Sequence, residues 1–75
     1  MTTEQLHAFF IGHGYIPNRW GAYQKPLLPG VRYKIKKLVL RKERQLSDGG
    51  WFRVSSGYLA HLELTPDGKL KGLSQ

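Results

Sequence analysis

The sequence predicts an α+β fold, with a short N-terminal helix packed on an antiparallel meander of three or four strands. Three observations predict it. A helix-capping signal opens the chain, apolar and basic residues alternate from Val31 onward, and the turn sequences at 47–50 and 65–68 are too short for crossover connections. The chain has 75 residues, so we expect one small basic domain spanning residues 1–75.

The helix is predicted over roughly residues 3–13. Thr2 and Gln5 have the spacing of a capping box, in which each side chain bonds the backbone of the other residue. Phe9 and Phe10 lie on an apolar stripe at helical spacing and supply its largest apolar area. A helix this short is not stable alone, so we expect it to dock by burying both phenylalanines.

The segment 15–30 is interpreted as a long irregular connector, because prolines and glycines interrupt it repeatedly. It also contains aromatic residues, among them Trp20 and Tyr23, that flexible linkers seldom carry. We therefore expect the connector to wrap over the core and to bury Trp20.

The sheet is predicted to begin at Val31 with a half-buried strand, because apolar and basic residues alternate there. The alternation slips at Lys37, and Leu38 and Leu40 follow out of phase. A β-bulge near Lys36 and Lys37 would return both leucines to the core face. We expect one long bent strand in which Leu38 is buried.

Three further strands are predicted over Trp51–Ser55, Tyr58–Leu64 and Lys69–Leu73, separated by turn sequences rich in Gly, Pro, Asp and Ser. A single helical turn that begins near Ser56 is an alternative for part of the middle segment, because its leucines also fit helical spacing.

The Pro29–Gly30 turn, followed by a bent basic strand, loosely resembles the opening of SH3-like barrels. The resemblance implies an alternative fold, a small SH3-like barrel with the N-terminal helix as an appendage. It implies no site residue, cofactor or partner.

Positive charge is the strongest functional signal in the sequence. The formal net charge is +7, from 12 basic and 5 acidic residues, and such an excess attracts polyanions. The segment 32–44 concentrates this charge. On an extended strand, alternate side chains stand about 6.6–6.8 Å apart on one face, which makes a linear cationic stripe. The alternative interpretation is a solvated outer face whose lysines prevent edge-to-edge aggregation.

An aromatic residue beside a cation adds to this signal. Trp51 and Arg53 share the outward face of the strand 51–55 if Phe52 and Val54 face inward, and exposed aromatics beside cations stack and clamp single-stranded nucleic acid. The sequence leaves open whether Trp51 lies in the core or on the surface.

We therefore predict a non-catalytic nucleic-acid-binding domain of unknown specificity, for DNA or RNA. The predicted binding residues are Arg32, Lys34, Lys36, Lys37, Arg41, Trp51 and Arg53. The alternative is a small protein-interaction module, an inhibitor or assembly factor, that binds an acidic protein surface. Charge alone does not separate the two.

The sequence gives no sign of catalysis. It has no cysteine, which excludes thiolate metal sites, disulfides and cysteine nucleophiles. Its three histidines lack ligand spacing, and neither a G-x-S-x-G nor a phosphate-loop motif is present. We expect no enzyme activity, metal or cofactor. No apolar run is long enough for a membrane span, and the N-terminus lacks the basic start of a secretory signal, so we expect a cytoplasmic protein.

Overall fold

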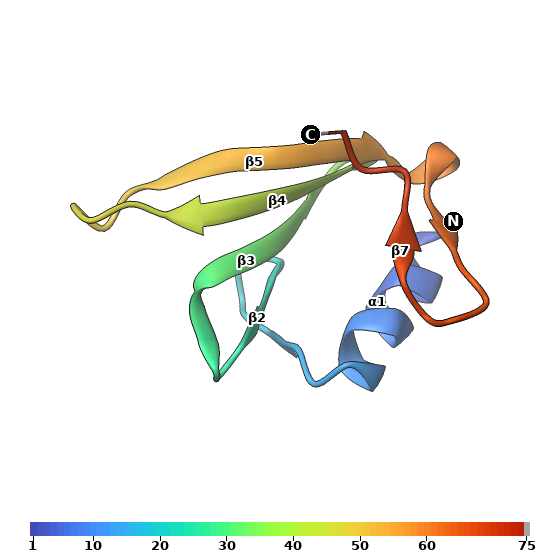
Figure 1. Ribbon diagram of the computed structural model, residues 1–75, viewed down its shortest axis with the longest axis horizontal. Coiled ribbons are helices and arrows are strands. Elements are labelled where there is room, and N and C mark those ends of the chain that lie inside the picture. Colours follow the sequence, from blue (N-terminus) through green and yellow to red (C-terminus); the bar gives the residue numbers. More distant parts are fainter. Residues whose placement is uncertain (75) are drawn as a thin grey trace.

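The chain folds into a helix, an open antiparallel sheet of five strands and a second sheet of two strands (Figure 1). We describe residues 1–74 from a computed structural model. The elements are α1 (Thr3–Gly12), β1 (Ile16–Pro17), β2 (Ala22–Lys25), β3 (Leu28–Lys36), β4 (Val39–Gln45), β5 (Trp51–Tyr58), η1 (Leu59–His61), β6 (Glu63–Leu64) and β7 (Leu70–Lys71).

The strands of the large sheet lie in chain order, β1-β2-β3-β4-β5, and each pairs antiparallel with the next. This confirms the α+β class and the meander. The barrel alternative is wrong, because the sheet stays open between β1 and β5. Figure 1 shows β4 and β5 running together along the upper part of the view, while β3 diverges from β4 and descends toward β2.

The helix begins as its capping box predicts. The Gln5 backbone N–H donates to Thr2 Oγ1 at 3.1 Å, and the Thr2 N–H donates to Gln5 Oε1 at 2.8 Å. These bonds satisfy backbone donors that a helix start otherwise leaves unpaired. Leu6 and Phe10 are fully buried, whereas Phe9 is only half-buried against the core, so the expected burial is confirmed for one of the two phenylalanines.

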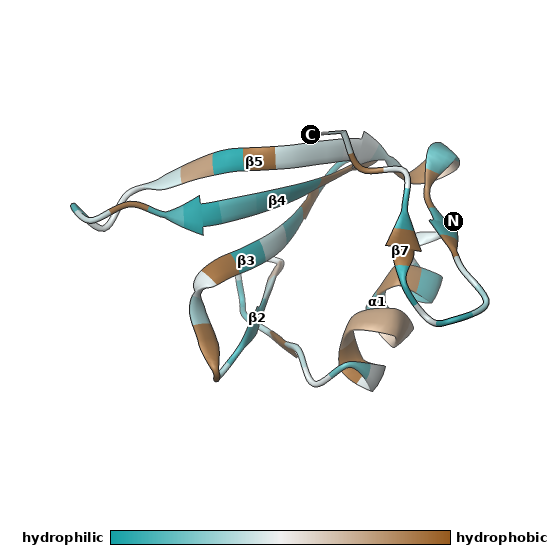
Figure 2. Cartoon of the chain, in the orientation of Figure 1, coloured by the Kyte–Doolittle hydropathy of each residue, from teal (hydrophilic) through white to brown (hydrophobic). Residues whose placement is uncertain are grey.

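The core lies between α1 and the sheet, and an aromatic cluster fills its centre. The Phe10 ring stacks on Tyr23 at 4.7 Å between centroids and lies 5.0 Å from Tyr33 and 5.1 Å from Tyr15. Tyr23 and Tyr33 are partners across β2 and β3, so they share the sheet face that the helix covers. Figure 2 shows the contrast: the helix carries apolar colours, and β4 is hydrophilic along much of its length.

The segment 15–30 is not an irregular connector, because it contains β1 and β2 and the turn that joins them. Asn18 Oδ1 organises this turn by accepting from the backbone N–H groups of Trp20 and Ala22 at 2.9 and 3.0 Å. Trp20 lies at the turn and is 69% exposed, so its predicted place in the core is wrong. Tyr23, three residues further along the chain in β2, is buried instead.

The predicted bulge near Lys36 is also wrong, because the chain reverses there. Lys36 pairs with Val39, so Lys37 and Leu38 form a two-residue hairpin loop. Lys37 takes a positive φ of 57°, and Leu38 is 70% exposed at the tip. The apolar alternation breaks at this point because a new strand starts, with its own phase.

A bulge does occur, in β5. Lys42 pairs with Ser55, but Glu43 pairs with Arg53, so Val54 is the extra residue on its strand. β5 continues through Ser56 and Gly57, where a break between two strands was predicted, and ends at Tyr58.

The predicted third strand, 58–64, is replaced by η1 followed by the short β6, as the helical-turn alternative anticipated. The last predicted hairpin is confirmed. β6 pairs with β7, and the turn between them closes with a bond from the Gly68 N–H to the Thr65 carbonyl at 2.9 Å.

Candidate nucleic-acid interface

Strand register brings most of the predicted binding residues onto one face of the large sheet, opposite the helix. Arg32 on β3 faces Glu43 on β4, which in turn faces Arg53 on β5. One step along, Lys34 faces Arg41. Directly opposed residues share a face. We call this surface the cationic face: Arg32, Lys34, Lys36, Arg41, Glu43, Trp51 and Arg53.

One predicted residue is not part of the cationic face. Lys37 lies in the hairpin loop that follows β3, at the end of the face. Within the face, Lys36 and Arg53 are exposed, and Lys34 is half-buried. Lys36 and Arg53 are therefore open to solvent, and neither they nor Lys34 form an ion pair within the described part of the chain.

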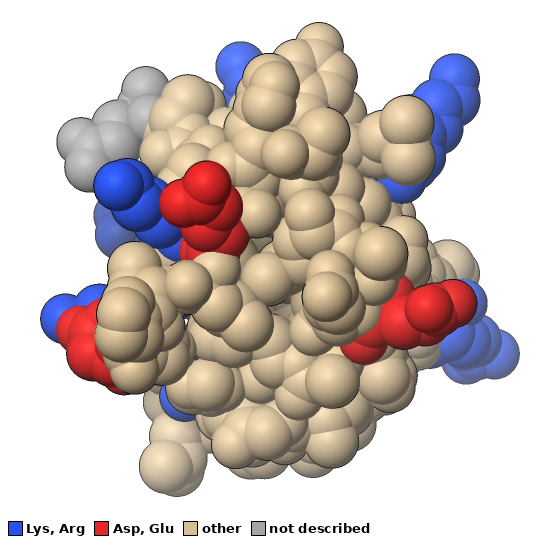
Figure 3. All heavy atoms as spheres, turned by 90° about the vertical axis from the view of Figure 1, so that its right-hand side faces the viewer, with Lys and Arg blue, Asp and Glu red and all other residues tan. Residues whose placement is uncertain are grey.

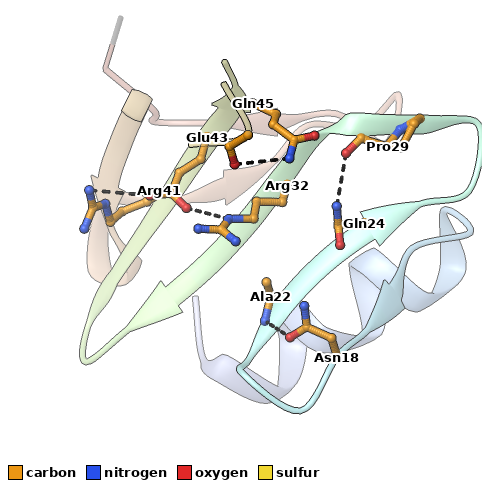
Figure 4. A network of polar contacts seen from close by, with 9 residues as sticks. Asn18, Ala22, Gln24, Pro29, Arg32, Arg41, Glu43 and Gln45 are labelled. Atoms are coloured by element: carbon orange, nitrogen blue, oxygen red, sulfur yellow. Dashed lines mark hydrogen bonds and ion pairs between the residues drawn. The ribbon is translucent and has the colours of Figure 1, made fainter. Parts of the chain in front are cut away.

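Glu43, which the sequence did not mark as a site residue, lies between Arg32 and Arg53 on this face. Its carboxylate is buried, with 8% side-chain exposure, and is bonded by two arginines (Figure 4). Arg32 Nε donates to Glu43 Oε1 at 2.7 Å, and Arg41 Nη2 lies 3.5 Å from Oε2. A buried carboxylate requires such partners, because an uncompensated charge away from water is costly. Glu43 was visible in the sequence as the lone acidic residue of the basic segment.

Trp51 is half-buried and does not offer two free ring faces. The guanidinium carbon of Arg32 lies 4.2 Å from the centre of its ring, a cation–π contact. The predicted role of Trp51 as a stacking surface for bases is therefore restricted to the part of the ring that Arg32 leaves uncovered. The most exposed tryptophan is Trp20, whose ring lies 4.7 Å from the Arg19 guanidinium at the β1–β2 turn.

The charge on the cationic face is strongly unbalanced. Five cationic side chains accompany one carboxylate, and the carboxylate is already paired. The end of the molecule that carries α1 has a different distribution of charge. Figure 3 views this end: uncharged residues cover most of the surface, and cations appear mainly at its margins. The positive charge of the chain is thus not spread evenly over the surface.

A second surface feature lies at the helix end of the molecule. It is an apolar hollow of about 780 Å³ between the start of α1, the β3–β4 loop and η1. Leu38 and Tyr58 line it and are 70% and 62% exposed. Large apolar side chains gathered at one exposed hollow are a common feature of interaction sites.

Two of the three histidines have hydrogen-bond partners within the fold. His7 Nδ1 lies 2.7 Å from the Tyr23 hydroxyl, and His13 Nδ1 lies 2.8 Å from the Phe9 carbonyl oxygen. Within residues 1–74 no group of three potential metal ligands comes together. No helix in the described chain is both long and apolar enough to cross a membrane.

Comparison with family models, curated proteins and solved structures finds no match for this chain. Its function is therefore argued from the geometry and charge of the two surfaces described above.

Proposed function

We propose that the protein is a non-catalytic nucleic-acid-binding domain that holds the phosphate backbone on its cationic face. One observation carries the proposal. The register of β3, β4 and β5 gathers five cationic side chains on one sheet face, with a single carboxylate that is already paired. A linear polyanion can neutralise such a face along its length and release its counterions.

The individual contacts follow from the strand geometry. Lys34 and Lys36 project from the same face of β3, about 6.6–6.8 Å apart by the rise of a strand. Arg53 extends the positive surface across to β5. Lysine and arginine contacts to phosphate position a nucleic acid without reading its bases, so binding should depend little on sequence.

The test compares two double variants that remove equal charge. In Lys34→Gln/Lys36→Gln the charge is lost from the cationic face, and in Lys69→Gln/Lys71→Gln from exposed positions at β7. Both pairs are two residues apart, so the variants are matched. DNA, RNA and heparin are titrated into each protein over a salt series.

The proposal expects the Lys34/Lys36 variant to bind DNA or RNA more weakly, with a salt slope reduced by about two phosphate contacts. The Lys69/Lys71 variant should remain close to the wild-type protein. Equal loss in the two variants would mean that net charge alone determines binding. Nucleic-acid binding no tighter than heparin binding would also count against the proposal.

The apolar hollow favours a second candidate function, a protein-interaction module that binds an acidic partner. Leu38 stands exposed at a hairpin tip beside Lys36 and Lys37, so an acidic segment carrying one apolar side chain would find complementary charge and shape there. If this is the main function, Leu38→Gln abolishes association with an isolated partner. The Lys34→Gln variant, altered on the sheet face, retains it.

A further inference from the structure

The Arg32 side chain is held in place from two directions. Its Nε donates to Glu43 Oε1 at 2.7 Å, and its guanidinium carbon lies over the Trp51 ring, 4.2 Å from the ring centre. The ion pair uses Nε alone, which leaves both terminal nitrogens outside it. A guanidinium fixed in this way loses little conformational freedom when it binds a ligand.

Arg41 approaches the same carboxylate from the neighbouring side. Its Nη2 lies 3.5 Å from Glu43 Oε2, so Glu43 holds the two arginines through its two oxygens. Arg41 Nε is buried and has no hydrogen-bond partner among the described residues. Because the protein covers this atom, Arg41 can offer a ligand only the terminal nitrogens of its guanidinium.

We propose that these residues form a preformed clamp for one phosphate group of the nucleic-acid backbone, in which Glu43 is the positioning residue. Arg32 supplies its two terminal nitrogens as a fork, the geometry that suits two oxygens of a phosphate. The Trp51 ring holds the Arg32 guanidinium by a cation–π contact, and stacking on nucleic-acid bases is not its main role. This inference rests on the proposed function. It identifies which residues of the cationic face hold a phosphate group in a defined geometry.

The role of Glu43 can be tested by whether nucleic-acid binding becomes tighter or weaker when its negative charge is removed. If Glu43 only opposes the incoming polyanion, removal of its negative charge must tighten binding, because the face becomes more positive. If Glu43 orients Arg32 and Arg41, the same change must weaken binding despite the added net charge. Electrostatics and positioning therefore predict opposite results.

The experiment compares Glu43→Gln with Glu63→Gln by fluorescence anisotropy of a short labelled single-stranded oligonucleotide at one salt concentration. Glu63 is exposed on β6, so its variant makes the same charge change away from the cationic face. We expect Glu43→Gln to bind about five- to tenfold more weakly, the loss of one charge-assisted contact. Glu63→Gln should bind as tightly as the wild-type protein or slightly more tightly. Binding by Glu43→Gln that equals or exceeds that of Glu63→Gln overturns the clamp.

A second pair of variants keeps the charge constant, in case Glu43→Gln does not fold. Arg32→Lys retains the cation but loses the planar fork and the Nε contact, whereas Arg44→Lys makes the same change at an exposed arginine of β4 that lies outside the cationic face, opposite Val31 and Phe52. The clamp predicts that Arg32→Lys weakens oligonucleotide binding by about fivefold and that Arg44→Lys has little effect. Equal effects would show that Arg32 acts only as a charge.

An NMR titration separates failure of the clamp from failure of the proposed function. Inorganic phosphate is added while the Nε–H signal of Arg32 is followed. If oligonucleotides do not bind but this signal shifts and saturates, the clamp is correct and the nucleic-acid function is wrong. If oligonucleotides bind and Glu43→Gln binds as tightly as wild type, the function stands and the clamp is wrong. Absence of both responses refutes both.

Discussion

Lys34 on β3 lies directly opposite Arg41 on β4, so two cations face each other across neighbouring strands. Like charges at opposed positions of an antiparallel pair destabilise the sheet. Arg41 also contacts the Glu43 carboxylate, with Nη2 at 3.5 Å from Oε2. A phosphate bound over the pair of cations would relieve their repulsion, so the same charges that oppose folding favour binding.

The first prediction follows from this pair. Lys34→Gln should raise the free energy of unfolding by about 0.2–1 kcal/mol at low salt, because it removes the repulsion. The gain should shrink as salt is added, since salt screens charges near the surface. Urea melts at two salt concentrations measure it, with Lys71→Gln on β7 as the control for net charge. A stability gain as large in the control would show that the opposed pair is not the cause.

The second prediction concerns the hairpin loop between β3 and β4. Lys37 has a φ of 57°, in the left-handed region that non-glycine residues rarely adopt. Lys37→Gly should stabilise the protein by about 0.5–1 kcal/mol, because the relief of strain exceeds the added flexibility of glycine. Lys37→Gln removes the same charge but keeps the strain. The difference between the two variants in a thermal melt isolates the strain, and equal melting temperatures would contradict it.

The same loop shows where the sequence was ambiguous. Asp48 and Gly49, like Asp67 and Gly68, are residues that favour turns, and both turns were predicted correctly. Lys37 and Leu38 have no such preference. A break in apolar alternation is the same signal for a bulge and for a two-residue loop, so local pattern alone could not distinguish them.

The hairpin loop at Lys37 and Leu38 also explains why the ion pair between Glu43 and Arg32 was not predicted. Alternation within β3 was enough to place Arg32, Lys34 and Lys36 on one face. The contacts of Glu43 depend on the register of β4 against β3, which the loop sets. In one continuous strand, Glu43 would be far from Arg32 in space. With the hairpin, the two residues are opposed and their ion pair follows.

The third prediction concerns the packing of the C-terminal segment against η1. Gly72 has a φ of 113°, and a Cβ atom there would lie 2.5 Å from the His61 carbonyl oxygen. Gly72→Ala should therefore destabilise the protein by about 1–3 kcal/mol, through backbone strain and a clash with backbone atoms. The control is Gly12→Ala at the end of α1, where the added Cβ meets nothing within 4 Å apart from its chain neighbours and the backbone of its own helix.

Alanine is a better helix former than glycine, so the control should leave stability unchanged or raise it by up to about 1 kcal/mol. Chemical denaturation of both variants measures the contrast. If Gly72→Ala unfolds at the wild-type denaturant concentration, the close approach between the C-terminal segment and η1 is not maintained in solution.

The last prediction is a loss of stability at alkaline pH that arises in the aromatic core. Burial raises the pKa of Tyr33 above its ordinary value of 10.0, and the negative charge of an ionised Tyr15 raises it further. Burial likewise raises the pKa of Tyr15. The folded protein therefore holds these protons more tightly than the unfolded chain. Their contribution to stability is complete below about pH 10 and is lost as the pH rises through the higher folded-state pKa values.

We expect the free energy of unfolding to fall above about pH 10, and Tyr33→Phe to make that fall shallower because the variant has one fewer group to ionise. Urea melts across the alkaline range measure the slope, and the ultraviolet absorbance of tyrosinate reports ionisation directly. Tyr58→Phe is the control, since Tyr58 is 62% exposed and lies outside the core cluster. If Tyr33→Phe and Tyr58→Phe change the slope equally, burial of Tyr33 beneath the helix is not its source.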